Sequence, residues 1–315
     1  MKVKSKLPAI IYTGVFLTLT LCMLTRSRLS LQYACLGLLL WYNAMIPTLL
    51  PFMILSGIMI RMGLTEKFSA VLYPVVKPVY HVSKNVCYAM IMGFLCGFPM
   101  GAKTVADLYE REMITEEEAK FLLAFCNNIG PIYFVSFVLP LLERKLVFPY
   151  LFGMYGLPLI YGWALRYTFF RKRLGYHTAI PYNSAQYPAT QYNLMAAVDD
   201  SIQSGVQSIL SLGGYMILFN LLNILPHILL QKNTFLFAPL LEISGGLRLL
   251  GNTFPLYSLL MLPFGGFSCI AQTYSCIKKT HLSIADYTFH KLFLTMLTGL
   301  YYLLWRLMFP ASFLS

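Results

Sequence analysis

The sequence predicts an all-α fold: a polytopic helical membrane protein with two pseudo-symmetric repeats that contain broken helices or re-entrant hairpins. Apolar residues make up 58% of the 315 residues and charged residues 11%, which favours a helical membrane protein over a soluble domain. Several uncharged runs reach the roughly 20 residues that a helix needs to cross a bilayer. The pattern G-F-x-x-x-A-(K/Q)-T occurs twice, at 97–104 and 266–273, and indicates an internal duplication.

Positive charge lies in short clusters beside the apolar runs, although the net charge is +12. The clusters are Lys2, Lys4 and Lys6, Arg166 with Arg171, Lys172 and Arg173, and Lys278 with Lys279. This distribution is typical of cytoplasmic loops under the positive-inside rule and argues against nucleic-acid binding. The seven cysteines are scattered and form no C-x-x-C pattern, so we expect them to be apolar helix residues without a bound metal.

Residues 1–28 predict an N-terminal transmembrane helix. A basic start precedes an apolar run, and Arg26 and Arg28 stand where a signal peptide would need a small-x-small cleavage site. We therefore expect this segment to remain uncleaved. The rest of the chain divides into three parts: a first repeat, 29–165, a polar and cytoplasmic linker, 166–200, and a second repeat, 201–315.

The apolar run 29–60 is too long for one straight span and contains Pro47 and Pro51. Prolines remove backbone donors, so we expect the run to break into half-spans with free carbonyls near Asn43 and Thr48. Such carbonyls can face a solute, which makes Thr48 a candidate binding residue. An ordinary proline kink packed against a neighbour is the alternative.

The first motif is a turn, Gly97-Phe98-Pro99-x-Gly101, that ends an apolar run and is followed by Lys103. The pattern Thr104-x-x-Asp107 predicts a capping box at the start of the next helix. Free N–H groups and the helix dipole favour negative charge at such a position, so the turn is a candidate anion site. Its candidate residues are Gly97, Phe98, Pro99, Gly101, Lys103 and Thr104.

The first repeat continues with a second capping box, Thr115 to Glu118, and with a span over 121–142. Asn127 and Asn128 interrupt that span just before Gly130 and Pro131. Buried amides need hydrogen-bond partners. Asn127 therefore either lines a solute pathway or seals a kink.

The second repeat begins with polar residues at three- and four-residue steps, which places Gln207, Ser208 and Ser211 on one stripe of an apolar helix. The stripe lines a cavity in one interpretation and mediates close helix packing in the other. Glu242 is a lone acid among apolar residues and glycines. It lies either at a membrane edge or against Lys103 as a buried partner.

The second motif supplies Gly266, Phe267, Ser268, Gln272 and Thr273 at positions that correspond to the first motif. Ser283 to Asp286 then repeats the capped helix start seen at Thr115. Paired interrupted segments in two halves indicate a transporter-like site at a repeat interface. We expect Gly97 to superpose on Gly266 and the two turns to approach each other.

The motif residues 97–104, together with 47–52, 241–246 and 266–268, resemble the sporulation integral membrane protein family YlbJ, also called stage V sporulation protein V. The core of that family is similar to the nucleoside-recognition or gate domain of nucleoside and ferrous-iron transport proteins. The resemblance covers most of the chain. It implies a polytopic protein of the outer forespore membrane that is needed for the passage of dipicolinic acid into the forespore.

Three functions follow from these observations. The first is a transporter or channel for a small organic anion, with dipicolinate as the expected solute. The second is a nucleoside permease, and the third is a non-transporting scaffold of a sporulation complex. We expect no enzyme and no cofactor, because the H-E-x-x-H, G-x-S-x-G and phosphate-loop patterns are absent. The expected partners are the solute, the lipid bilayer, and a second copy or other sporulation membrane proteins.

Overall fold

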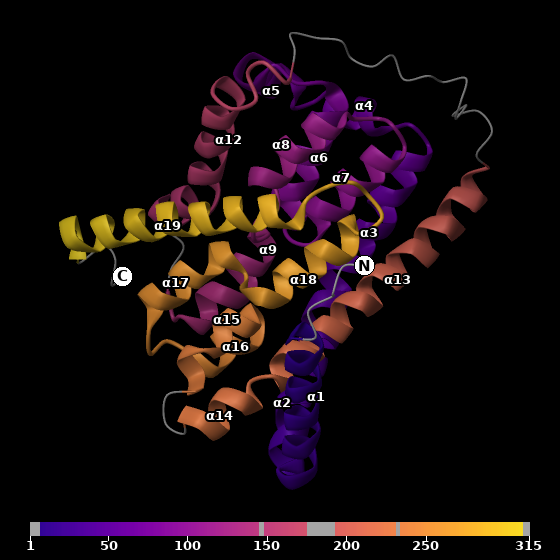
Figure 1. Ribbon diagram of the computed structural model, residues 1–315. Helices are drawn as coiled ribbons and strands as arrows, with labels where there is room; N and C mark the ends of the chain where they lie inside the picture. Colours follow the sequence, from indigo (N-terminus) through magenta and orange to yellow (C-terminus); the bar gives the residue numbers. More distant parts are fainter. Residues whose placement is uncertain (1–6, 145–147, 175–192, 231–233, 311–315) are drawn as a thin grey trace.

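The computed structural model describes residues 7–144, 148–174, 193–230 and 234–310, and every regular element in these ranges is helical (Figure 1). The predicted all-α class is therefore confirmed. Three helical segments, 27–61, 194–228 and 255–277, are long and apolar enough to cross a bilayer. The basic start of the chain, Lys2 to Lys6, and most of the predicted linker lie outside the described residues.

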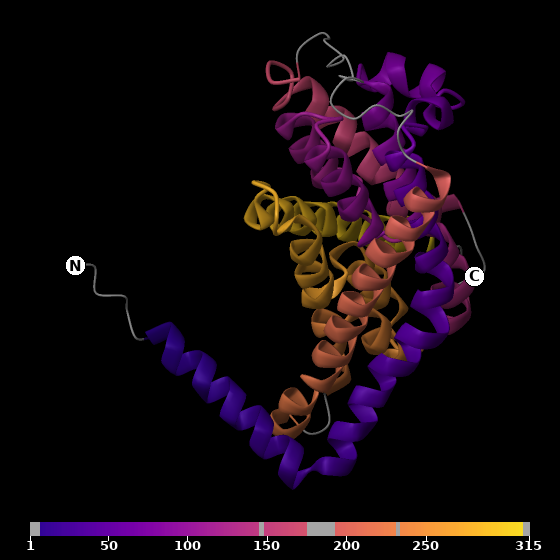
Figure 2. The same ribbon diagram turned by 90° about the vertical axis from the view of Figure 1, so that its right-hand side faces the viewer.

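The first helix leans away from the rest of the molecule, and the chain then turns back along it (Figure 2). Helix α1 (Leu7–Thr25) turns at Arg26 into α2 (Ser27–Leu40), which continues through a π-helical turn, Trp41–Met45, into α3 (Ile46–Arg61). The predicted break into half-spans is therefore wrong, because residues 27–61 form one continuous helix. The widened turn and the Thr48 hydroxyl, which donates to the Ala44 carbonyl at 2.6 Å, keep the backbone bonded around the prolines.

The first motif joins two helices, α6 and α7. The helices of this part are α4 (Thr65–Ser69), α5 (Tyr73–Tyr80), α6 (Lys84–Cys96), α7 (Met100–Glu110) and α8 (Glu116–Phe125). The capping box predicted at Thr115 is confirmed, since its hydroxyl accepts from Glu118 N–H and the Glu118 carboxylate accepts from Thr115 N–H. The capping box predicted at Thr104 is wrong. Helix α7 starts directly after Pro99, and Asp107 pairs with Lys103 instead.

The interruption predicted at Asn127 is present, because α8 ends at Phe125 and residues 127–130 are not helical. Several short segments follow it. They are α9 (Pro131–Tyr133), a π-helical turn (Phe134–Val138), α10 (Leu139–Leu141), α11 (Phe148–Leu151), a second π-helical turn (Phe152–Gly156) and α12 (Leu157–Tyr167). The first half thus contains a non-helical segment, 127–130, between apolar helices.

The second half begins with the long helix α13 (Leu194–Leu221), which lies along α2 and α3 (Figures 1 and 2). The later elements are α14 (Ile224–Leu230), a 3-10 turn (Thr234–Leu236), α15 (Ala238–Leu241), α16 (Ile243–Leu250), α17 (Pro255–Phe264), α18 (Gly266–Ile277) and α19 (Ile284–Met308). Ser283 caps α19 as predicted, since its hydroxyl accepts from Asp286 N–H at 3.2 Å. Gly265 separates α17 from α18 at the second motif.

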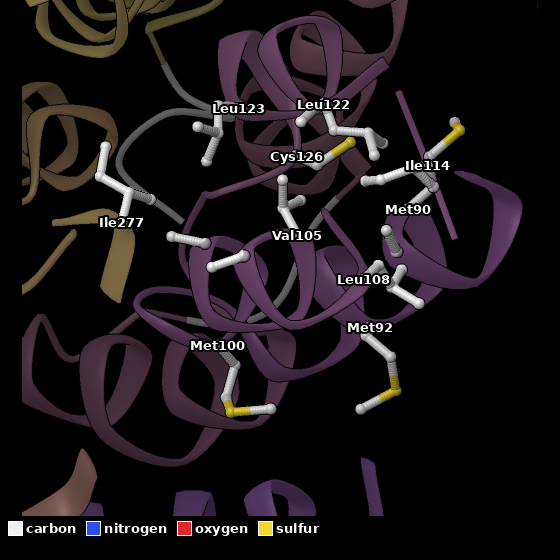
Figure 3. Packing of buried hydrophobic residues seen from close by; sticks show 14 of the residues in the cluster. Met90, Met92, Met100, Val105, Leu108, Ile114, Leu122, Leu123, Cys126 and Ile277 are labelled. Carbon is white, nitrogen blue, oxygen red and sulfur yellow. The ribbon is translucent and has the colours of Figure 1, made fainter. Parts of the chain in front are cut away.

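The largest apolar core surrounds α6, α7 and α8, and Figure 3 shows its side chains converging between these helices. Val105, Leu108 and Leu122 are completely buried there. Large apolar side chains are also exposed on outer helices, for example Phe16 on α1 and Met296 on α19. An exposed apolar surface of this extent suits contact with lipid rather than with water.

Candidate functional site

A cavity of about 250 Å³ opens where α3, α7 and α18 end beside the first half of α13. Six of the predicted site residues line this cavity. They are Pro99, Lys103, Gln207, Ser208, Ser211 and Gln272. The polar stripe of α13 therefore lies on the cavity, and both motifs contribute to the same wall.

The lining of this cavity is cationic. Five basic side chains face it, against two acidic ones, Asp107 and Glu110; the basic residues are Arg61, Lys103, Arg111, Lys278 and Lys279. Like charges gathered in a hollow reinforce one another's electric field and raise the local concentration of oppositely charged solutes. The arrangement can hold a small anion without a metal or cofactor.

Lys103 takes part in this lining as an ion-paired residue. Its ammonium lies 2.5 Å from Asp107 Oδ1, one helical turn further along α7, and the two side chains are 17% and 23% exposed. Asp107 therefore offsets part of the charge of Lys103. Arg61 is paired in the same way, with Asp200 at 3.9 Å, so the positive field of the cavity depends mainly on Arg111, Lys278 and Lys279.

At the start of α7, where the sequence predicted an anion site, the chain itself accepts from two of the amide groups. Gly101 N–H donates to the Gly97 carbonyl at 3.1 Å. Ala102 N–H donates to Asn127 Oδ1 at 3.3 Å. These donors point into the protein, so an anion in the cavity would meet side-chain cations and not a free helix terminus.

A second, smaller chamber of about 50 Å³ adjoins the cationic cavity, and Leu212 and Gln272 line both. The chamber is mostly apolar and contains three of the predicted site residues besides Gln272: Thr48, Phe98 and Glu242. Its size leaves room for a few water molecules. The two spaces therefore meet at Leu212 and Gln272.

Glu242 is buried and caps α16. Its carboxylate accepts from Ser244 N–H at 3.1 Å, from Gly245 N–H at 2.6 Å and from Asn220 Nδ2 at 3.0 Å. The interpretation as a partner of Lys103 is wrong, because Lys103 pairs with Asp107 and the buried Glu242 bonds to Ser244, Gly245 and Asn220 instead. A helix start that needed a cap explains why an acid lies in this apolar region.

Asn127 lines neither space and instead ties the two motifs together. Its Nδ2 donates to Thr273 Oγ1 and to Tyr287 OH, both at 3.0 Å, and its Oδ1 accepts from Ala102 N–H. The kink-sealing interpretation therefore holds for this amide. The network brings the first motif, the break after α8 and the second motif into contact.

The other predicted residues fall into three groups. Gly101, Thr104, Ser268 and Thr273 are buried, and Phe267 is 50% exposed on the outer surface. Gly97 and Gly266 both have a φ of +79°, a left-handed conformation that favours glycine. The two turns do approach each other, because a Cβ added at Gly265 would lie 3.3 Å from Phe98 Cζ.

Sequence reasoning missed Arg61, Arg111 and Lys291. Arg61 ends α3 and Arg111 follows α7, so both look like ordinary residues at a membrane edge. Lys291 stands at the start of an apolar run, where a lysine is usually an interfacial anchor. In the structure it is 2% exposed. A charged residue near the start of an apolar segment was the only signal that could have found it.

Taken together, the described residues form an integral membrane protein of the polytopic helical class, in which two interrupted segments meet beside a cationic cavity. Residues 44–142 match the family model Gate, described as nucleoside recognition. The chain is 27% identical, over an alignment of 350 residues, to the sporulation integral membrane protein YlbJ of Bacillus subtilis strain 168, with 98% of this chain and 85% of that protein covered. No solved structure matches. The similarity to YlbJ that the motifs predicted is confirmed.

Proposed function

We propose that this protein is a transporter or channel that moves a small organic anion across a membrane through the cationic cavity. One observation carries the proposal: five basic side chains and two acidic ones face a hollow that is formed by both repeated motifs. A neutral solute would gain little from this excess of positive charge. An anion gains from each cation, and this gain grows as the solute displaces water from the cavity.

Dipicolinate is the solute we infer, with a role in sporulation and a location in the outer forespore membrane. Two arguments support this choice. The similarity to a sporulation integral membrane protein extends over 98% of the chain, and the motif resemblance implies dipicolinate as the solute. Dipicolinate is also a small planar dianion, which suits several cations placed around one hollow.

The path beyond the cavity would pass Leu212 and Gln272. The chamber on the other side of these residues is about 50 Å³, which is too small for an organic dianion but large enough for water. Under this proposal the present arrangement admits a solute from one side only. Passage then requires α13 and α18 to separate at Leu212 and Gln272, as one repeat moves against the other.

The test is uptake by purified protein in liposomes. Labelled dipicolinate should accumulate in vesicles that contain the protein and not in empty vesicles, and excess unlabelled dipicolinate should compete. A labelled nucleoside, at the same concentration, should not accumulate. Absence of dipicolinate uptake in vesicles with correctly folded protein would refute the proposal.

The nucleoside permease is the second candidate, because the matching family model is described as nucleoside recognition. In the same vesicles it predicts uptake of the nucleoside without uptake of dipicolinate. A scaffold predicts uptake of neither solute. The three functions therefore give three different results in one experiment.

A further inference from the structure

The ammonium group of Lys291 lies against the non-helical segment 127–130 that follows α8, which we call the break. Its Nζ donates to the Asn127 carbonyl at 2.5 Å and to Asn128 Oδ1 at 3.3 Å. Lys291 belongs to α19, more than 160 residues further along the chain, and is 2% exposed. A side chain of the second half therefore occupies the interruption in the first half.

Within the described ranges, no carboxylate forms an ion pair with Lys291. Its charge faces two carbonyl-type oxygens and two aromatic rings. The ring centroids of Phe98 and Tyr287 lie 5.5 Å and 5.9 Å from Nζ. A buried ammonium without a counter-ion is unfavourable unless such dipoles and ring faces surround it.

Oxygen atoms at an unwound point of a membrane helix form the kind of site that binds a monovalent cation. In transporters with interrupted helices, freed carbonyls at the break coordinate the coupling ion, such as sodium. Here the break at 127–130 directs a backbone carbonyl and an amide oxygen toward one point, and the ammonium of Lys291 occupies that point. The ammonium of Lys291 thus occupies the position that a free monovalent cation would take.

We infer that Lys291 is a built-in cation at the break after α8, and that this protein needs no free sodium or potassium ion there. The inference goes beyond the proposed function because it concerns the break and not the transported solute. Lys291 acts as a positioning residue. It fixes the Asn127 carbonyl while the Asn127 side chain holds Thr273, and its ammonium faces the Phe98 ring that lines the smaller chamber.

The test removes the ammonium and offers a free ion in its place. Lys291→Ala should melt at a lower temperature than the wild type in choline chloride. Sodium chloride, potassium chloride or methylammonium chloride at the same ionic strength should raise the melting temperature of this variant by about 2–4 °C, the shift that a modestly bound ion produces. The wild-type melting temperature should not depend on which of these cations is present.

Lys278→Ala is the matched control, because it removes an exposed ammonium from the cavity lining, breaks no ion pair among the described residues and leaves the non-helical segment 127–130 intact. Its melting temperature should not respond to the choice of cation. If Lys291→Ala does not accumulate, Lys291→Met takes its place, since methionine keeps the apolar stem and ends one atom short of the Nζ position.

Two results would overturn the inference. One is a Lys291 variant whose melting temperature is the same in all four salts, which would make Lys291 a structural anchor only. The other is a wild-type protein that sodium stabilises as much as the variant, which would place the ion elsewhere. Both results are independent of uptake measurements, so a failed transport assay leaves this test valid.

Discussion

Lys103 is the cavity residue whose removal should affect an anion most directly. Lys103→Met removes a positive charge and also leaves Asp107 without its partner at 2.5 Å, so the cavity loses one cation and gains an uncompensated anion. We expect dipicolinate uptake at low concentration to fall about tenfold or more, the effect of losing a charge-assisted contact. Membrane insertion should be unchanged, as measured by the amount of protein per vesicle.

Two companion variants separate charge from packing at this position. Lys103→Arg keeps the charge and should retain part of the uptake. Lys103→Met combined with Asp107→Asn removes the pair together and should recover part of what Lys103→Met loses. Normal uptake per inserted Lys103→Met molecule would mean that Lys103 serves only as a membrane anchor.

Asn127 should matter for stability and not for solute contact. Asn127→Ala removes three hydrogen bonds and leaves Thr273, Tyr287 and the Ala102 amide buried without that partner. We expect the free energy of unfolding to fall by about 2–4 kcal/mol. Thermal unfolding measures this, with Gln203→Ala on the exposed face of α13 as a control that should change it by less than about 0.5 kcal/mol. An equally small effect at Asn127 would contradict the network.

At the scale of the elements, α13 presents different faces to the cavity and to the outside. Gln207, Ser208 and Ser211 line the cavity, whereas Leu210 is 55% exposed away from it. Cysteines placed at the three polar positions should react with a water-soluble thiol reagent in intact membranes. A cysteine at Leu210 should react slowly, because lipid covers that face.

The labelling experiment needs a background without Cys276, since this residue also lines the cavity. Rates are compared by mass spectrometry after a fixed exposure, with and without excess dipicolinate. Protection of the three polar positions by dipicolinate would support solute binding there. Uniformly slow reaction would favour the interpretation of the stripe as a helix-packing surface.

At the scale of the whole molecule, the sequence predicted the helical membrane class and the contact between the two motifs. It did not predict which side chains bond to one another. Composition and run length are local properties, so the helical membrane class could be read directly. The start of α7 was missed because Met100 to Lys103 can join a helix as readily as a turn. The contacts of Lys291, and those of Asn127 with Thr273 and Tyr287, could not be predicted, because they join residues that are 146 or more positions apart and depend on how the halves pack.

The electric field of the whole cavity gives a last prediction, which concerns salt. Lys278 and Lys279 are exposed at the end of α18 on the rim of the cavity, while Lys103 lies further in. Charges on a rim mainly steer a solute toward its site, and salt weakens that steering. Lys278→Gln with Lys279→Gln should therefore slow initial dipicolinate uptake at about 0.01 M salt, where the screening length is about 30 Å.

At about 0.15 M salt, where the screening length is about 8 Å, the same double variant should approach the wild-type rate. Lys103→Met should remain impaired at both salt concentrations, because its charge acts over a few ångströms inside the cavity. Initial rates of labelled uptake at the two ionic strengths, measured for all three proteins, separate steering from binding. A double variant that is equally slow at both salt concentrations would show that Lys278 and Lys279 contact the anion itself, and one that is fast at both would show that the field of the rim does not guide the solute.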